Sequence, residues 1–347
     1  MATSVIKQSV GIDVSKKELS VCFSNLEQGQ RTRILSTKTF NNTSAGFKKL
    51  ESWVLKLRQN EVPFCLLMEA TGVYYEDAAY FLKAKDWSVS VLLPNKTKAF
   101  AKSLDYKSKT DKIDAKILAQ MSLERSLPLW EPLSPKMLTI KRLCRERVAL
   151  QDQKTVAKNQ LHAKQHAHET EKNSLKRSEK LIQFLKKQIG QVEKAIGQEV
   201  ETDAVLKEKI EKVCSIKGVA LITAATVIAE TNGFALIENK AQLVSYAGYD
   251  VVENQSGSSI RGKTKISKKG NSHLRRAMHF PALNAIKYVP ELKALYERVF
   301  EKTKIKMKGS VAVQRKLLVL IYTLFKKNEA FDPSYPKTPA LVTLQTK

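Results

Sequence analysis

Four acidic residues in the first third of the chain have the types and positions needed to hold a metal ion. Asp13 lies within an apolar run, and Glu69 ends a second apolar run. A carboxylate in such a run is costly to bury unless it is paired or coordinates a cation. Asp111 and Asp114 are three residues apart in a segment with helical character, so we expect them to share one helix face.

Oxygen ligands converging from two strands and a helix suit Mg²⁺, which prefers carboxylates and keeps several waters. Two such ions about 4 Å apart can stabilise both the attacking and the leaving oxygen in phosphodiester cleavage. We therefore predict Mg²⁺, two ions per site, with these four carboxylates as metal ligands and catalytic residues. A single acidic residue is usually solvated or salt-bridged, so the prediction depends on the set of four.

A second segment, residues 245–290, combines hydroxyl groups with strong positive charge. No Asp or Glu occurs from Gln255 to Pro290, where glycines punctuate a basic loop that leads into a helix near Asn271. Loops of this kind bind phosphates, although on charge alone a non-specific basic flank is the simpler interpretation. The residues predicted to bind nucleic acid, here and beside the aspartates, are Lys109, Lys112, Arg261, Lys263, Lys265, Lys268, Lys269, Arg275 and Arg276.

The elements that would position the four acids occur in the first 130 residues. Alternating and continuous apolar patterns predict, in order, strands at 10–14, 19–23 and 33–40, a helix at 43–57, a strand at 64–68, a helix at 74–83 and a strand at 88–93. Strands followed by helix–strand–helix–strand predict a ribonuclease-H-like α/β domain for residues 1–130.

The remainder of the chain is predicted to be mostly α-helical. Residues 131–212 have two glycines and no proline after Pro135, which predicts a long helical hairpin, a coiled-coil arm broken near residues 171–174. Its apolar stripe indicates an oligomerisation arm, with a solvated spacer as the alternative. Residues 213–328 form a predicted helical domain, in which Gly218 separates two apolar stretches, and residues 329–347, with three prolines, form a tail.

Composition narrows the class of protein. The 347 residues suit two or three domains, and 60 Lys and Arg against 34 Asp and Glu give a charge of +26. Such an excess favours nucleic acid as the partner, although a merely basic or ribosomal protein shares it. The four cysteines form no C-x-x-C pair, which argues against disulfides and a zinc site. No signal peptide or membrane span is recognisable, so we expect a cytoplasmic, bacterial-type protein, associated with the nucleoid when active.

Several blocks resemble a known family. GIDVSKKELSVC, LLMEATGVYYEDAAYFL and LPNKTKAFAKSLDYKSKTDKIDAKILAQ resemble the DEDD-type insertion-sequence transposases, whose nuclease domain is similar to RuvC Holliday-junction resolvases. QSG and IRGKTKISKKGNSHLRRAMHFPA resemble the C-terminal domain of the same family. One departure is the segment 246–251, which lacks the proline that the family often has there.

The resemblance implies roles for particular residues. Asp13, Glu69, Asp111 and Asp114 match the four metal-binding carboxylates, and Ser256 matches the serine nucleophile that forms a covalent phosphoserine intermediate. Residues 216–224 resemble a helix–hairpin–helix, although a plain packing motif is nearly as good an interpretation.

The resemblance also implies partners. These are donor and target DNA, a structured guide (bridge) RNA encoded by the element, and a homodimer or tetramer whose active site is shared between subunits. A hydrolytic junction nuclease, needing the carboxylates but no serine, and a non-enzymatic basic nucleic-acid-binding protein remain the alternatives.

Overall fold

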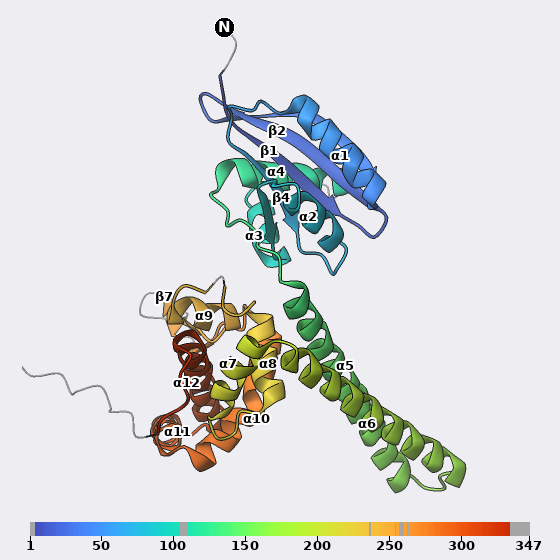
Figure 1. The fold of residues 1–347 in the computed structure, drawn as a ribbon, viewed down its shortest axis with the longest axis vertical. Coiled ribbons are helices and arrows are strands. Elements are labelled where there is room, and N and C mark those ends of the chain that lie inside the picture. Colours follow the sequence, from blue (N-terminus) through green and yellow to red (C-terminus); the bar gives the residue numbers. More distant parts are fainter. Residues whose placement is uncertain are drawn as a thin grey trace, which may run out of the picture. The chain divides into compact units, whose positions relative to one another are not determined.

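A computed structural model describes residues 4–104, 110–235, 237–253, 255–256, 260–261 and 264–333. For residues 255, 256, 260 and 261 it describes the backbone alone. The chain divides into two compact units, Met1–Pro132 and Leu133–Lys347 (Figure 1). The first contains the four predicted carboxylates and the second contains Ser256.

The first unit is built on a five-stranded mixed sheet with the strand order β3-β2-β1-β4-β5. Three long strands come first and pair as antiparallel neighbours: β1 (Val5–Val14), β2 (Glu18–Glu27) and β3 (Arg31–Asn41). The two later strands, β4 (Phe64–Glu69) and β5 (Val89–Leu92), add in parallel on the other side of β1. The strand β1 is therefore central, and its carboxyl end lies beside that of β4.

Helices cover both faces of this sheet. The helices α1 (Ser44–Leu57) and α2 (Glu76–Lys83) share one core with the even-numbered residues of β1, such as Val10 and Ile12. The helices α3 (Pro94–Ala101) and α4 (Asp111–Glu124) share a second core with Leu67 of β4. Since successive strand residues point to opposite faces, the odd-numbered residues of β1 face α4.

Gly11 explains how closely α4 approaches the sheet. A Cβ atom at this position would lie 2.2 Å from the carbonyl oxygen of Ala115 and 2.2 Å from the amide nitrogen of Ala119. The neighbouring residues are also small, because Cys22 on β2, opposite Gly11, forms a buried cluster with Ala115 and Ala119. The helix backbone therefore packs directly on the strand backbone.

The order of strands and helices predicted for this unit is confirmed, with strands one to five residues longer at some ends. The helix α3 was not predicted, because Pro94 was interpreted only as the end of a strand. Pro94 is instead the first residue of α3, a position where proline's missing N–H costs nothing.

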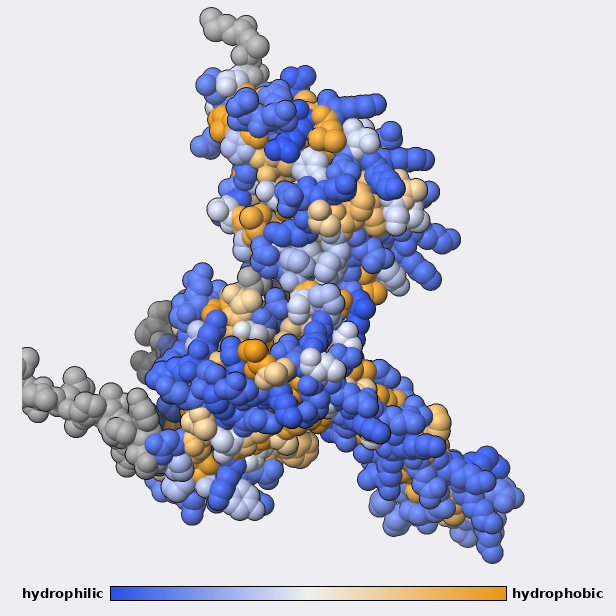
Figure 2. Space-filling view, viewed as in Figure 1, coloured by the Kyte–Doolittle hydropathy of each residue, from blue (hydrophilic) through white to orange (hydrophobic). Residues whose placement is uncertain are grey.

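The second unit is mostly helical. Two long helices, α5 (Pro135–His166) and α6 (Lys172–Glu201), pack on one another and form the arm of Figure 1. Along their outer part Leu185 of α6 is buried with Ala157 of α5, whereas Leu181 and Phe184 are exposed. The arm surface seen in Figure 2 is mostly hydrophilic.

The remaining helices share one core with the inner ends of α5 and α6. They are α7 (Ala204–Cys214), α8 (Leu221–Glu230), α9 (Lys240–Ala247), α10 (Ser272–Tyr288), α11 (Pro290–Thr303) and α12 (Lys306–Lys327). Gly218, in the turn between α7 and α8, has a φ of +104°, which a residue with a side chain rarely adopts. None of the helices in the described part of the chain is long and apolar enough to cross a membrane.

The close packing at Gly11 predicts a specific stability defect. Gly11→Ala should destabilise the first unit by about 1–3 kcal/mol, the usual cost of overpacking a tight core. Gly190→Ala, in α6, is the matched control, because nothing lies within 4 Å of its Cβ position. A helical Gly→Ala change of that kind should be neutral or stabilising. Urea unfolding followed by circular dichroism checks both, and equal midpoints for the two variants would contradict the packing described.

Candidate active site

Asp13 and Glu69 are neighbours on two parallel strands. The register of β1 and β4 pairs Ile12 with Met68, so the next residues along, Asp13 and Glu69, lie side by side at the carboxyl ends of the strands. Neighbouring strands are about 4.8 Å apart. Both side chains point to the α4 face, because Gly11 and Leu67, two residues before each, contact α4 there.

The two aspartates reach the same place from α4. Asp111 and Asp114 lie in its first turn, which Thr110 caps by accepting a hydrogen bond from the backbone N–H of Ile113. Nζ of Lys7, near the start of β1, donates to the carbonyl of Leu123, near the end of α4, at 3.4 Å, so the helix runs antiparallel to the strand. From Ala115, which lies against Gly11, the four residues back along the helix cover about 6 Å, and the two residues forward along β1 cover about 6.6 Å. The matching distances bring the first turn of α4 to Asp13.

The electrostatics of Asp13 agree with this placement of the four acids. The pKa of Asp13 is raised from its ordinary value of 3.8 to about 6, first by burial and then by the negative charges of Asp111, Asp114 and Glu69. Each of the three carboxylates that share the predicted site therefore acts on Asp13. The structure brings together the four residues predicted from sequence.

The carboxylates are close enough to repel one another but do not form a closed metal cage. Among the described residues, no three His, Cys, Asp or Glu side chains are grouped tightly enough to hold a metal ion. Charge repulsion acts over many ångströms, whereas coordination by Mg²⁺ requires about 2.1 Å. A set of carboxylate oxygens fits a hard divalent cation such as Mg²⁺, and lacks the nitrogen and sulfur ligands typical of structural zinc.

Glu69 is held in place by two hydroxyl groups. Thr71 donates to Oε1 at 3.2 Å, and the hydroxyl of Thr97, a buried residue of α3, contacts Oε2. Such partners fix the orientation of a ligating carboxylate. Thr97 was missed from the sequence, because it lies 28 residues after Glu69 and in a helix that was not predicted.

Ser256 lies in the second unit, on a β-hairpin. The strand β6 (Val251–Val252) pairs with β9 (Lys265–Ile266), and further out β7 (Gln255–Ser256) pairs with β8 (Ile260–Arg261). The backbone of Ser256 is opposite Ile260. The side chain of Ser256 is outside the described part of the structure, as is that of Arg261.

The base of this hairpin is tightly anchored. The backbone N–H of Lys268 donates to the carbonyl of Gly248 at 3.1 Å, and that of Asn271 donates to the carbonyl of Tyr246 at 2.8 Å. A Cβ atom at Gly270 would lie only 2.5 Å from the amide nitrogen of Gly248. The segment before the hairpin and the segment after it are therefore locked together.

The predicted nucleic-acid-binding residues fall into two groups. Lys112, Lys265, Lys268 and Lys269 are exposed, as a phosphate-binding role requires. By contrast, Arg275 donates to the carbonyl oxygens of Ala247 and Gly270, at 2.7 and 3.1 Å.

Arg276 also has a protein partner. It bonds Asp152 of α5, which raises the pKa of its guanidinium. Lys109 and Lys263 lie outside the described residues.

Glu230 is a further residue that was missed from the sequence. It is 2% exposed, and it accepts hydrogen bonds from Arg145 at 2.7 and 3.0 Å and from Asn271 at 2.8 Å. Burial alone would raise its pKa, but these bonds and the charge of Arg145 lower it below the ordinary value. Asn271 in turn caps α10 by accepting from the N–H groups of His273 and Leu274. Glu230 ends an apolar run, the same signal that marked Glu69.

Two family models match this chain. One, described as a transposase, matches residues 10–170, and the other, described as the transposase IS116/IS110/IS902 family, matches residues 210–297. The pilin gene-inverting protein of Moraxella bovis is 28% identical over 328 residues, which is 94% of this chain and 98% of that protein. The protein of the same name from Moraxella lacunata matches to the same extent.

One similar solved structure is the T. thermophilus RuvC protein in complex with a Holliday junction substrate. It is 12% identical, covers 35% of this chain and 99% of its own, and has a TM-score of 0.27.

The raised pKa of Asp13 predicts how stability depends on pH when no divalent cation is present. The unfolded state loses this proton near pH 4 and the folded state near pH 6, so ionisation of Asp13 favours unfolding. Its contribution to stability therefore falls as pH rises from about 4 to about 6. In EDTA, Asp13→Asn should melt at a higher temperature than the unmodified chain at pH 8, and the difference should vanish near pH 3.5.

Mg²⁺ provides the control for this experiment. Added at pH 8, it should raise the melting temperature of the unmodified chain more than that of Asp13→Asn, because the variant lacks one of the four charges. If Asp13→Asn melted lower than the unmodified chain in EDTA at pH 8, the repulsive cluster described here would be wrong.

Proposed function

The chain belongs to the DEDD-type insertion-sequence transposase family, whose models match residues 10–170 and 210–297, and from that premise we propose that it cleaves and rejoins DNA by means of Ser256 and bound Mg²⁺. The family is one of DNA recombination enzymes. The observation that carries the metal-dependent part is that the β1–β4 register sets Glu69 beside Asp13 and that α4, with Asp111 and Asp114 in its first turn, packs on Gly11 of the same strand.

In this proposal the residues Asp13, Glu69, Asp111 and Asp114 hold two divalent ions. When bound, the ions supply positive charge that stabilises the attacking and leaving oxygens of the phosphodiester. The chain's own contribution is to set the four carboxylates at one place through the β1–β4 register and the packing of α4 on Gly11. Thr71 and Thr97 keep Glu69 from turning away.

Ser256 is the proposed nucleophile. Attack of its Oγ on a phosphodiester forms an ester bond to phosphorus and breaks one bond from phosphorus to a deoxyribose oxygen. The serine proton passes, overall, to the released deoxyribose hydroxyl. The phosphoserine keeps the energy of the broken bond, so the reverse attack by a DNA hydroxyl rejoins strands without another energy source. The anchored base of the hairpin supports this role by fixing the strands that lead to Ser256.

The nucleic-acid partners are proposed from the family and from the protein's net positive charge. We propose donor and target DNA as substrates, together with a structured guide RNA that pairs with both, so that the protein reads backbone and shape. The exposed Leu181 and Phe184 on α6 support dimerisation through the arm. In such an assembly the carboxylates of one copy act with Ser256 of another. The setting we propose is the cytoplasm, at the nucleoid.

The names of the relatives suggest the outcome of the reaction. The two Moraxella proteins are named for inverting a pilin gene. Inversion and transposition both require strands to be cut and rejoined, so the same chemistry serves either. We propose that this chain moves or inverts a DNA segment without net hydrolysis.

A serine substitution separates this proposal from a hydrolytic junction nuclease. Ser256→Ala should reduce strand cleavage by roughly 10³-fold or more, as expected for the loss of a nucleophile. It should also abolish the covalent protein–DNA product seen on a denaturing gel. Ser258→Ala, a serine two residues further along the sequence, is the matched control and should retain both. Cleavage that survives Ser256→Ala but is lost in Asp13→Asn would identify a hydrolytic nuclease instead.

A further inference from the structure

A cationic groove lies on the first unit, along its outermost strand. It has a volume of about 600 Å³ and runs between β3, the edge strand of the sheet, and α1. We call it the lysine groove, because its charged lining residues are Lys38, Lys48, Lys49 and Lys56. These lysines belong to none of the motifs that identify the active site.

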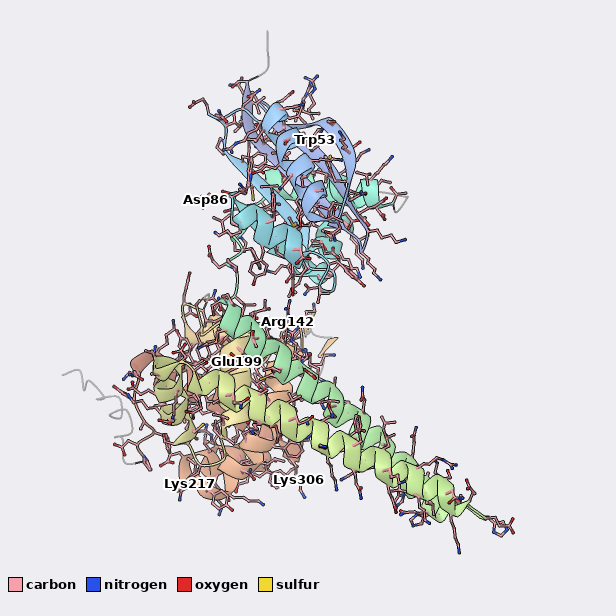
Figure 3. The ribbon with its side chains drawn as sticks, turned by 45° about the vertical axis from the view of Figure 1, so that its right-hand side comes forward. Trp53, Asp86, Arg142, Glu199, Lys217 and Lys306 are labelled. Atoms are coloured by element: carbon pink, nitrogen blue, oxygen red, sulfur yellow. The ribbon has the colours of Figure 1, made fainter. Side chains whose placement is uncertain are left out.

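The periodicity of the two elements explains why the lysines face one another. Lys48, Ser52 and Lys56 are spaced four residues apart on α1 and therefore share a helix face. Lys38 points to the same side of β3 as Phe40, and its Nζ lies 5.5 Å from the Phe40 ring centroid. Phe40 packs against Trp53, labelled in Figure 3, with ring centroids 5.7 Å apart. The floor of the groove is thus aromatic and its rim is cationic.

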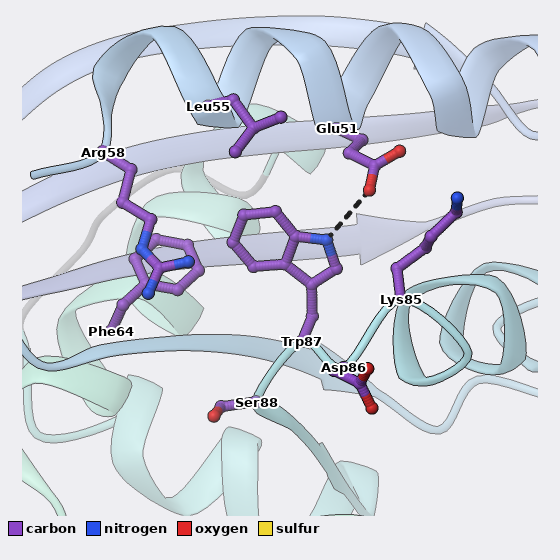
Figure 4. A pocket seen from close by; sticks show the side chains of 8 residues that line it. All are labelled: Glu51, Leu55, Arg58, Phe64, Lys85, Asp86, Trp87 and Ser88. Carbon is purple, nitrogen blue, oxygen red and sulfur yellow. Dashed lines mark hydrogen bonds between the residues drawn. The ribbon is translucent and has the colours of Figure 1, made fainter. Parts of the chain in front are cut away.

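No carboxylate is among the described residues that line the groove. The sequence has no Asp or Glu from Arg31 to Leu50. Glu51, three residues after Lys48, does not line the groove and accepts from Nε1 of Trp87 at 3.2 Å (Figure 4). Four ammonium groups with no carboxylate among the described lining residues repel one another, so a bound polyanion would stabilise the groove.

The groove also contains the start of α1. Thr43 caps this helix of 14 residues by accepting from the N–H of Gly46. A Cβ at Gly46 would lie 1.9 Å from the carbonyl oxygen of Asn41, so the helix begins directly against the end of β3. The positive end of the helix dipole and the hydroxyl of Thr43 therefore add to the lysines as groups that attract phosphate.

We propose that the lysine groove binds the sugar-phosphate backbone of duplex DNA without reading its sequence. From Lys48 to Lys56 the helix rises about 12 Å, which is the rise of three to four base pairs along a duplex axis at about 3.4 Å each. Two copies of this chain would not pair through the groove, because their lysines would meet face to face.

The bound DNA is not the strand being cut. The groove lies on the α1 face of the sheet, whereas Asp13 and Glu69 point to the α4 face. The lysine groove therefore holds DNA that flanks the cleavage site or belongs to the second DNA partner. This inference rests on the proposed function only in taking DNA as the polyanion.

The test is a salt titration of DNA binding. The variant Lys48→Gln/Lys56→Gln removes two groove charges, and Lys83→Gln/Lys85→Gln is its matched control. The control lysines are in the same unit but lie beside carboxylates. Lys83 pairs with Glu131 at 3.1 Å, and Lys85 lines a cavity with Glu51 and Asp86 (Figure 4). Full-length proteins are titrated with a fluorescent duplex by anisotropy, in EDTA, so that neither metal nor cleavage affects the result.

The groove variant should bind duplex DNA roughly tenfold more weakly or worse near 0.1 M salt. The slope of log affinity against log salt should fall by about 1.8, or 0.9 for each phosphate that is no longer neutralised. The control should match the unmodified chain, and melting temperatures of all three should agree. Unchanged DNA binding by the groove variant would overturn the proposal. A loss of affinity seen only with an RNA duplex of the same sequence, and not with the DNA duplex, would overturn it as well. Since both measurements are made in EDTA, their outcome is independent of Ser256 and the carboxylates.

Discussion

The direct contact between the backbones of α4 and β1 is the constraint on which the acidic site depends. Because Gly11 has no side chain, Ala115 and Ala119 reach the strand, and the first turn of α4 comes to the end of β1. A larger residue would lift the helix and carry Asp111 and Asp114 away from Asp13. The register of β1 with β4 supplies the fourth acid, Glu69, from the neighbouring strand. The site is thus made by packing between segments that are distant in sequence.

The same packing holds groups of like charge close together, which is electrostatically unfavourable. Burial and the negative charges of the other three acids raise the pKa of Asp13. On the other face of the sheet, the lysine groove gathers positive charges. Each arrangement is unfavourable in the isolated protein and becomes favourable with a partner, a divalent cation in one case and a polyanion in the other. A net charge of +26 is consistent with a chain that works while covered by nucleic acid.

Much of the first unit could be predicted because its signals are local. Alternating apolar residues marked the strands, and the acids within apolar runs marked Asp13 and Glu69. The contacts of Thr97 and the lysine groove could not be predicted, since both depend on how elements distant in sequence meet in space. Glu230 carried a readable signal, an acid ending an apolar run, but its partners Arg145 and Asn271 lie 85 and 41 residues away. The helix α3 was not predicted from the sequence, because a single proline, Pro94, both follows a strand and begins a helix.

The central proposal, that β1, β4 and α4 bring their acids to one site for divalent cations, is tested most directly by locating a bound cation on the chain. Fe²⁺ can replace Mg²⁺ at oxygen-ligand sites, and with ascorbate and peroxide it cleaves the backbone next to where it is bound. We expect cuts near residues 13, 69 and 111–114, suppressed by excess Mg²⁺ and lost in Asp13→Asn. Cuts confined to one of these segments, or to other parts of the chain such as the neighbouring His162 and His166 of α5, would contradict the claim.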